Sequence, residues 1–243
     1  MQIGRKIIRL DSVDSTNNYI ANLLKEGILE DGTVILADEQ YAGRGQRNVE
    51  WLANPGENLT FSFFLRNVNL SVQNQFYLTC IVSISLVRLL NKFGLNAKIK
   101  WPNDIYIDQK KIAGVLIENQ LSSLTVKSSI VGIGLNINQI EFNGMSATSV
   151  LKETGAQKLP MDVLYSYIEL FNSNWSQFSE HMLPEIKSVY LSNLFQLNEL
   201  KKYEDEGGIF EGKITDVLDS GHLIVDRAGI QKKYELKEIS FKL

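Results

Sequence analysis

Two short stretches in the first quarter of the sequence combine side chains that could bind a polar, anionic ligand. Ser15, Thr16 and Asn17 bring hydroxyl and amide groups to the expected start of a helix, where they could cap the helix or hydrogen-bond a compact ligand. Residues 43–47 read GRGQR, within an unusually long connection at residues 40–58. Backbone N–H groups of such a glycine-bearing turn can form an anion nest, and arginine can contact a phosphate through two N–H groups at once. This second stretch predicts a loop that orders around an anion.

Three further stretches could complete such a site. Residues 100–104 (KWPND) join a bulky aromatic, a proline that ends a strand and a polar turn, and residues 111–114 (KIAG) place a lysine ahead of two small residues. Gly132 and Gly134 fall on one face of an expected strand, where the missing side chains let a flat ligand approach the backbone. Each stretch alone also fits an ordinary structural role, such as a strand end, a surface lysine or tight packing. Their chemistry becomes specific only in combination.

Composition and charge narrow the classes of function. The chain of 243 residues is 44% hydrophobic, enough to bury a core, and its net charge of −3 disfavours a general nucleic-acid surface. The single cysteine, Cys80, excludes an internal disulfide framework, and two distant histidines, His181 and His222, leave no zinc cluster. The most apolar run, residues 76–90, is too short to span a bilayer, and the start lacks the apolar core of a signal peptide. We therefore expect a cytoplasmic protein without membrane contact.

Two nucleotide-binding patterns are present only in part. Residues 207–213 (GGIFEGK) match the beginning of a P-loop, but Ile214 stands where Ser or Thr would hold magnesium, and a strand is expected next instead of a helix. Gly43, Arg44 and Gly45 lack the third glycine of a dinucleotide fingerprint. The sequence also contains no HExxH and no GxSxG. We therefore interpret residues 207–213 as a turn, and set a Rossmann reading aside.

The elements that must position these stretches follow from apolar periodicity, caps and turn residues. In the first part of the chain we expect strands at residues 6–10, 33–39, 59–66, 97–101, 105–107, 112–118 and 124–138. The helices expected there are at residues 16–27, 71–93, 146–153, 160–182 and 184–194. From about residue 195, short strands at 209–217, 222–227, 230–236 and 238–242 predict a small antiparallel barrel of the SH3-like kind. We therefore divide the chain into a large domain at 1–194 and a C-terminal domain at 195–243.

Together, in this order and spacing, the motifs resemble the catalytic domain of the biotin protein ligases, which attach biotin to a lysine of a carrier protein. The resemblance covers nearly the whole chain: the STN start, AGRGQR with Trp51 after it, KWPND, KIAG seven residues on, the GIGLN strand and the terminal small β domain. It implies an α+β fold, in which a mixed β-sheet with helices is related to class II aminoacyl-tRNA synthetases and is followed by an SH3-like β-barrel.

The resemblance also implies a two-step reaction. Biotin carboxylate attacks the α-phosphate of ATP and gives biotinyl-AMP and pyrophosphate, and a carrier lysine then attacks the mixed anhydride and releases AMP. Because both reactants of the first step are anionic, cations must screen their approach, and magnesium on the triphosphate is expected. The implied cofactors and substrates are thus ATP, biotin and Mg²⁺, for an ATP-dependent biotin–[acetyl-CoA-carboxylase] ligase.

By family position, the residues implied to act directly in the chemistry are Lys111 and Arg44. The residues implied to bind biotin are Ser15, Thr16, Asn17, Gln40, Gly43, Arg44, Gly45, Gln46, Lys111, Gly114, Gly132 and Gly134. The residues implied to bind ATP are Arg44, Gln46, Arg47, Trp51, Asn103, Lys111 and Asn136. No residue set for the metal follows from the resemblance.

The sequence departs from the family pattern inside the glycine-bearing loop. Many members read GRGRxGR, whereas here Gln46 replaces the second arginine and Asn48 the following glycine. Asparagine tolerates the left-handed backbone region best among non-glycine residues, so the turn can survive. We expect Arg47 to supply the charge that Gln46 lacks when the loop retains the adenylate.

The implied partner is the biotin carboxyl carrier protein domain of a biotin-dependent carboxylase. Some family members also carry an N-terminal DNA-binding domain, but here the STN motif begins at Ser15, so we expect no DNA binding. Exposed sheet edges are compatible with a homodimer without requiring one. Two alternatives remain at this stage: a lipoate–protein ligase of the same scaffold, and a non-catalytic module that binds biotin or an adenylate.

Overall fold

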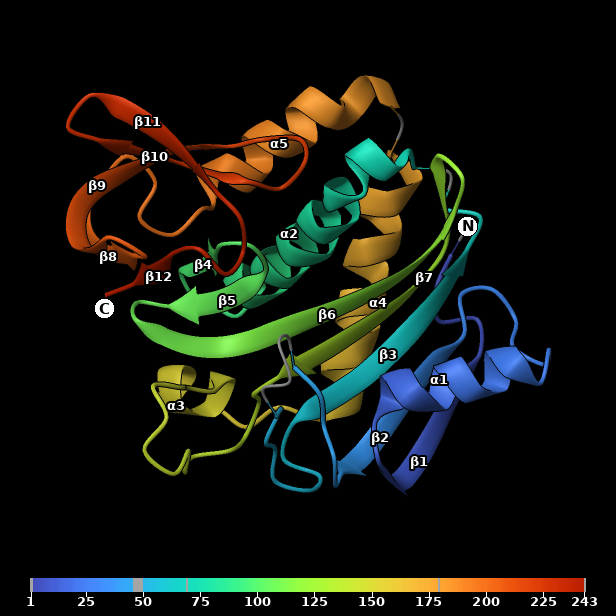
Figure 1. Ribbon diagram of the computed structural model, residues 1–243. Coiled ribbons are helices and arrows are strands. Elements are labelled where there is room, and N and C mark those ends of the chain that lie inside the picture. Colours follow the sequence, from blue (N-terminus) through green and yellow to red (C-terminus); the bar gives the residue numbers. More distant parts are fainter. Residues whose placement is uncertain (1, 46–49, 69, 179, 243) are drawn as a thin grey trace.

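The computed structural model describes residues 2–45, 50–68, 70–178 and 180–242. Within these residues the chain forms a seven-stranded sheet of order β1-β2-β3-β7-β6-β5-β4 and a five-stranded sheet of order β11-β10-β9-β8-β12 (Figure 1). In the first sheet β1 (Ile7–Val13) and β2 (Val34–Gln40) are parallel and every other neighbouring pair is antiparallel. The expected α+β class with a mixed sheet is confirmed.

The parallel pair is joined by a helix, because parallel neighbours need a crossover connection. This helix, α1 (Thr16–Lys25), packs Ile20 against Ile35 of β2 and Phe64 of β3 (Leu59–Arg66) in a small apolar cluster. It therefore covers one face of the sheet over β2 and β3, in front of the strands in Figure 1.

The opposite face carries the main core. Alternate residues of β3 point there, and Phe61 and Phe63 contact Tyr167 and Phe171 of α4 (Pro160–Ser176) through their rings. The buried helix α2 (Phe76–Lys92) packs beside α4, behind the sheet in Figure 1. With a helix layer on each face, β3 is almost wholly buried, as its apolar sequence predicts.

The intervening residues of the central strands are small or polar and share the face with α1. In the register of β3 and β7 (Thr125–Leu135), Thr60 lies opposite Gly134 and Ser62 opposite Gly132. In the next pair, β7 with β6 (Lys110–Ser122), Gly134 lies opposite Gly114. Helix α1 contacts β2, β3 and β7, and the small residues of β6 and β7 beside its start form a smooth, polar floor on this face.

Several expected helices are shorter than predicted. Residues 146–148 are extended because they bond to Lys111, which donates from its backbone N–H to Ser146 (3.0 Å) and accepts from Thr148 (2.9 Å). Helix α3 (Val150–Thr154) starts only after Ser149, whose hydroxyl accepts from Lys152 N–H at 3.2 Å. Likewise Ser71 caps a short 3₁₀ turn, η2 (Val72–Asn74), ahead of α2.

The remaining boundaries differ by a few residues. The expected helix at 160–182 ends at Ser176, and η3 (Glu180–Met182) and α5 (Leu183–Ser192) follow. The hairpin predicted around residues 105–118 is formed by β5 (Asp104–Ile107) and β6, beside β4 (Ala97–Lys100). As predicted, Pro102 follows the end of a strand.

The C-terminal sheet contains one strand that the sequence does not predict, β8 (Leu200–Asp205), in which Tyr203 is the only buried apolar residue. The others are β9 (Gly208–Val217), β10 (Leu223–Arg227), β11 (Ile230–Tyr234) and β12 (Ser240–Phe241). Residues 207–213, interpreted as a turn, therefore belong mostly to β9.

The two sheets share one apolar core and several polar contacts. Trp101 donates from its indole N–H to Gly221 at 2.9 Å, and Tyr77 donates to Asp219 at 2.8 Å. Lys187 of α5 pairs with Asp216 at 3.1 Å. The C-terminal sheet thus lies firmly against the strands that carry KWPND. The proposed boundary at 194/195 falls in the connection between α5 and β8.

Candidate active site

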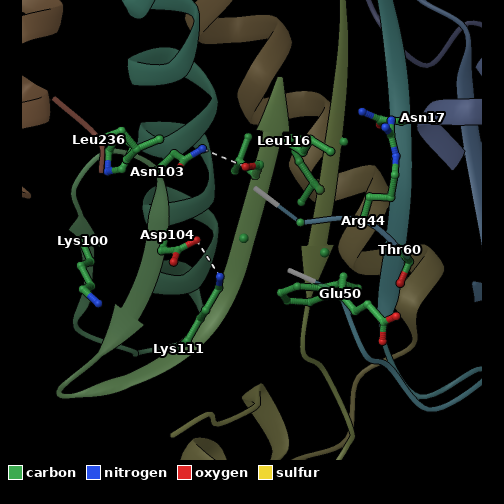
Figure 2. Close-up of a pocket in the computed structure, with 18 of the residues that line it drawn as sticks. Asn17, Arg44, Glu50, Thr60, Lys100, Asn103, Asp104, Lys111, Leu116 and Leu236 are labelled. Carbon is green, nitrogen blue, oxygen red and sulfur yellow. Dashed lines mark hydrogen bonds and ion pairs between the residues drawn. The ribbon is translucent and has the colours of Figure 1, made fainter. Parts of the chain in front are cut away.

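A cavity of about 440 Å³ lies over this floor of the large sheet (Figure 2). Its volume is in the range of sites for small organic ligands. One side is formed by the start of α1 and by the loop after β2, and the other by β5 with Phe241 of the C-terminal sheet and Leu236 of the connection between β11 and β12. Residues near the N-terminus and residues near the C-terminus, far apart in sequence, therefore line the same cavity.

Glycines in the floor let other side chains lie directly against the strand backbone. A Cβ atom on Gly134 would overlap the indole of Trp51, and one on Gly114 would lie 3.2 Å from the same ring. A Cβ atom on Gly132 would overlap the amide of Asn17. The predicted close approach to a glycine backbone is therefore present. In this structure the Trp51 and Asn17 side chains make this approach.

The STN motif does not cap its own helix. Ser15 has extended backbone geometry (φ −157°) and makes no capping bond with its side chain. Instead the side-chain oxygen of Gln40 accepts from the Thr16 backbone N–H at 2.8 Å and lies 3.0 Å from the Thr16 hydroxyl. Because Gln40 satisfies the helix start, the buried hydroxyl of Ser15 is spared from capping and is left for the cavity that it lines.

A carboxylate that the sequence analysis does not single out links the two N-terminal motifs. Glu118 of β6 accepts from the Asn17 amide at 2.7 Å and from Arg44 Nη2 at 2.8 and 2.9 Å. The Asn17 side-chain oxygen accepts in turn from Ser62 at 2.6 Å. Glu118 follows Gly114 by four residues on a strand, so period-two alternation alone places both on the same face.

The described ends of the loop at 40–58 are more ordered than a free connection. Arg44 and Glu50 form an isolated β-bridge, and Trp51 N–H donates to Gly43 at 2.9 Å. This pairing directs the Trp51 indole onto the glycine floor. Gln46, Arg47 and Asn48 lie outside the described residues, so the compensation expected from Arg47 stays a prediction.

Lys111 stands between the floor and the second side of the cavity. Its ammonium lies 2.8 Å from a carboxylate oxygen of Asp104 and 5.7 Å from the Trp51 ring centre (Figure 2). Asn103, next to Asp104, gives its side-chain N–H to the backbone oxygen of Val115 at 2.8 Å, which fixes the KWPND turn on β6.

A second cation lies deeper on that side. The Lys100 ammonium is 3.2 Å from the Tyr106 hydroxyl and 5.1 Å from the ring centre of Phe241 in the C-terminal sheet. Burial lowers the pKa of Lys100, Asp104 opposes this change, and Lys111 adds to it. Burial also raises the pKa of Tyr106 to about 12, so this hydroxyl keeps its proton at neutral pH.

Most of the residues predicted for the site line this cavity. They are Ser15, Thr16, Asn17, Gln40, Arg44, Gly45, Trp51, Asn103, Lys111, Gly114, Gly132 and Gly134. Gly43 lies just behind the lining, where a Cβ atom would come within 2.5 Å of the Trp51 backbone oxygen. Asn136 is not brought to the lining, because its buried amide donates to the backbone oxygen of Thr148 at 3.0 Å. The role expected for Asn136 in nucleotide binding gains no support from this position.

Within residues 2–45, 50–68, 70–178 and 180–242, no three His, Cys, Asp or Glu side chains come together as a metal cluster would require. Nor does any helix there have both the length and the apolar character needed to cross a bilayer.

The sequence is similar to a known protein family and to individual members of it over most of the chain. A model of the biotin/lipoate A/B protein ligase family matches residues 10–138. The bifunctional ligase/repressor BirA of Bacillus subtilis is 30% identical over 240 residues, which cover 96% of this chain and 73% of that protein. The biotin–[acetyl-CoA-carboxylase] ligase of Paracoccus denitrificans is 29% identical over 228 residues, or 89% of this chain and 92% of that protein.

The fold matches over a still longer range. The biotin protein ligase from Aquifex aeolicus, solved in complex with biotin and ATP, has a TM-score of 0.81 at 31% identity and covers 98% of this chain and 99% of that one. The family model spans the STN, GRGQR, KWPND and KIAG motifs that surround the cavity. Because the family model matches more than half of the chain and the Bacillus relative is 30% identical along nearly all of it, the chain belongs to the biotin/lipoate A/B protein ligase family.

Proposed function

We propose that this chain is an ATP-dependent biotin–protein ligase, which makes biotinyl-5′-AMP and transfers the biotinyl group to a lysine of a biotin carboxyl carrier protein domain. One observation carries the proposal. The cavity has a glycine floor, with neutral hydrogen-bonding side chains at one end and the two lysines Lys100 and Lys111 at the other. The Paracoccus and Aquifex proteins named above are biotin ligases, and the Aquifex enzyme was solved with biotin and ATP.

The neutral end suits the head group of biotin. Its ureido ring has one carbonyl acceptor and two N–H donors, and Ser15, Thr16, Asn17 and Gln40 supply hydroxyl and amide partners within a buried space. The floor at Gly134 admits a flat ring once the Trp51 indole now over it moves aside, and the Asn17 amide over Gly132 borders it. Gly43, Gly45, Gly114 and the undescribed Gln46 complete the proposed biotin contacts.

The cationic end suits the reacting phosphate. In the first step a biotin carboxylate oxygen bonds to the α-phosphorus, and the bond to pyrophosphate breaks. Lys111 would screen the approach of these two anions and stabilise the charge that grows on the phosphoryl oxygens, and Arg44 would act with it from the side of the cavity near Asn17. Trp51 and Asn103, which line the cavity, would contact the nucleotide, and Arg47 would supply the charge that Gln46 lacks.

In the second step the neutral amine of the carrier lysine attacks the biotinyl carbonyl carbon. The bond to AMP breaks, and the amine loses a proton as the amide forms. The mixed anhydride would hydrolyse in open water, so the loop that carries Trp51 should cover it during transfer.

Mg²⁺ belongs to the proposal because protein sites for this ion often use one or two carboxylates with substrate phosphates. Asp104 and Glu50 are carboxylates that line the cavity and could take that part. Bound there with ATP, the ion would neutralise phosphoryl charge.

The proposed location and partners rest on the composition of the chain and on the edge of its large sheet. We propose a cytoplasmic enzyme without DNA-binding activity, on the grounds of its net charge of −3 and its single cysteine. The outer edge of β1 is free of a further strand among the described residues, which is compatible with a homodimer.

The test is biotin-dependent exchange of pyrophosphate into ATP by the purified chain. Exchange that needs biotin and is not supported by lipoate is the expected result. Exchange with lipoate alone would identify the lipoate ligase alternative. Tight biotin binding without any exchange would identify a non-catalytic module.

A further inference from the structure

The polar end of the cavity is held by a carboxylate that lies outside the four sequence motifs. Glu118 lies on β6, four residues after Gly114 and on the same face of the sheet. Its oxygens receive three hydrogen-bond contacts, from the Asn17 amide and from Arg44 Nη2. It therefore touches one residue from the STN motif and one from the GRGQR motif.

An ionised carboxylate only accepts hydrogen bonds, and this property fixes the direction of the whole chain of contacts. Asn17 must turn its NH₂ group to Glu118, so its oxygen faces Ser62, 2.6 Å away. Ser62 then gives its proton to Asn17, and its oxygen can accept from the Thr16 hydroxyl at 2.6 Å.

The chain of contacts ends at Thr16, whose single hydroxyl proton goes to Ser62 and not to the Gln40 oxygen 3.0 Å away. Gln40 is oriented independently, because its side-chain oxygen accepts from the backbone N–H of Thr16 at 2.8 Å. Without the carboxylate, the Asn17 amide could adopt either orientation, and each hydroxyl further along could donate in either direction. A ligand with a fixed set of donors and an acceptor would then meet a mixed pattern.

The same carboxylate restrains Arg44. The contact uses Nη2, and the guanidinium has other N–H groups with which to meet an anion. The side chains are 42% and 39% exposed, and ion pairs with such exposure contribute at most about 1 kcal/mol to stability. The position of this pair is therefore better explained by orientation than by stability.

We propose that Glu118 is a positioning residue, which sets the hydrogen-bond direction of Asn17, Ser62 and Thr16 and holds Arg44 at the cavity. This inference rests on the proposed function, since it assigns the oriented end to the biotin head group. Glu118 itself acts through these neighbours.

The variant Glu118→Gln tests the inference with little change of shape. One of the two oxygens becomes an NH₂ group, so it faces either Asn17 or Arg44 as a donor against a donor. We expect the KM for biotin in pyrophosphate exchange to rise about tenfold, the scale of one lost hydrogen bond to a charged group, with a smaller change in kcat. Glu118→Asp keeps an acceptor-only group and should raise this KM less.

Asp38→Asn is the matched control. It removes the same charge from the exposed pair with Arg9 (2.8 Å), two residues before Gln40 on the same strand. Its KM for biotin should stay within about twofold of the parent value, because it lies outside the oriented chain. Melting temperatures of all variants should be close to that of the parent.

The outcomes separate the inference from the proposed function. A parent chain without biotin-dependent exchange would contradict the proposed function. An active parent, together with a Glu118→Gln variant whose KM matches that of Asp38→Asn, would contradict the role of Glu118. Equal losses in Glu118→Gln and Glu118→Asp would also contradict it. If Glu118→Gln does not fold, a rise in KM for Glu118→Asp over Asp38→Asn supports the role, and no rise contradicts it.

Discussion

The two ends of the cavity are held in different ways. At the end near α1, neutral groups fix one another through short hydrogen bonds: the Thr16 backbone N–H donates to Gln40, the Thr16 hydroxyl to Ser62, and Ser62 to Asn17. At the other end Lys111 and Lys100 lie among one carboxylate and aromatic rings, and Phe241 comes from the C-terminal sheet. The first end is suited to recognise a neutral head group by pattern, whereas the second supplies positive charge. The difference predicts that mutations at the two ends will separate biotin binding from phosphate chemistry.

The largest effect is expected from Lys111→Ala. Its ammonium is placed where charge would develop on the phosphate, so its loss should reduce kcat for adenylate formation about a thousandfold. Biotin binding measured by calorimetry should weaken far less. Lys110→Ala, at the exposed neighbouring position of β6, is the control and should behave as the parent does. Equal losses in both variants would remove Lys111 from the chemistry.

A smaller but selective effect is expected from Gly134→Ala. The added Cβ would overlap the Trp51 indole, and any ring on the floor would meet the same methyl group. We expect biotin affinity to fall at least about tenfold, with a loss of ~1–3 kcal/mol in unfolding free energy from overpacking. Gly207→Ala, where a Cβ would have only one neighbour at 3.2 Å, serves as the control. Unchanged biotin affinity would show that the ligand does not use the floor.

The cationic end should respond to pH. Because burial lowers the pKa of Lys100, its positive charge is present below that lowered pKa and is lost as the pH rises through it. The KM for ATP should therefore rise with pH above neutrality, by about threefold to tenfold if one charge–phosphate contact is lost. Lys100→Arg, which keeps its charge, should flatten this rise, and the control Lys98→Arg should not. A rise that is the same in all three proteins would exclude Lys100 as its cause.

The smallest effect is expected from the C-terminal sheet. Asp205 accepts from Lys232, Tyr234 and the Gly207 N–H, at 2.9 Å each, and these contacts lower its pKa to about 2, with the bond from Lys232 as the largest cause. Its stabilisation is present above the unfolded pKa near 3.8 and is lost as the pH falls toward 2. Asp205→Asn should cost about 1 kcal/mol at pH 7 in urea unfolding, and the difference from the parent should vanish near pH 2.

The same variant bears on the comparison of the two ends. If the C-terminal sheet supports the cationic end, Asp205→Asn should change the KM for ATP more than the KM for biotin. Glu211→Gln, at an exposed position of β9, should change neither. An effect on biotin alone would contradict the division of the cavity.

Local sequence could predict the parts of the site that depend on neighbours along the chain. Period-two alternation indicates the strands that carry Gly114, Gly132 and Gly134, and short motifs indicate Lys111 and the STN group. Alternation also reveals that Glu118 faces the same side as Gly114, although its partner Arg44 is 74 residues away.

Other features depend on tertiary contacts that no local pattern carries. Asn136 looks like a ligand residue in GIGLN, but Thr148 takes its amide. Residues 146–148 look helical, but Lys111 pairs with them as an extended segment. Phe241 reaches the cavity only because the C-terminal sheet packs against the KWPND strands, and β8 has too few buried side chains to be recognised.

The most direct test of the account is transfer to a carrier. The chain is incubated with biotin, ATP, Mg²⁺ and a biotin carboxyl carrier protein domain, and the carrier is analysed by avidin blot and by mass. The account predicts one biotinyl group on one carrier lysine, dependent on ATP, present with Lys110→Ala and absent with Lys111→Ala. A carrier that stays unlabelled by the parent chain, or is labelled equally well by Lys111→Ala, would contradict it.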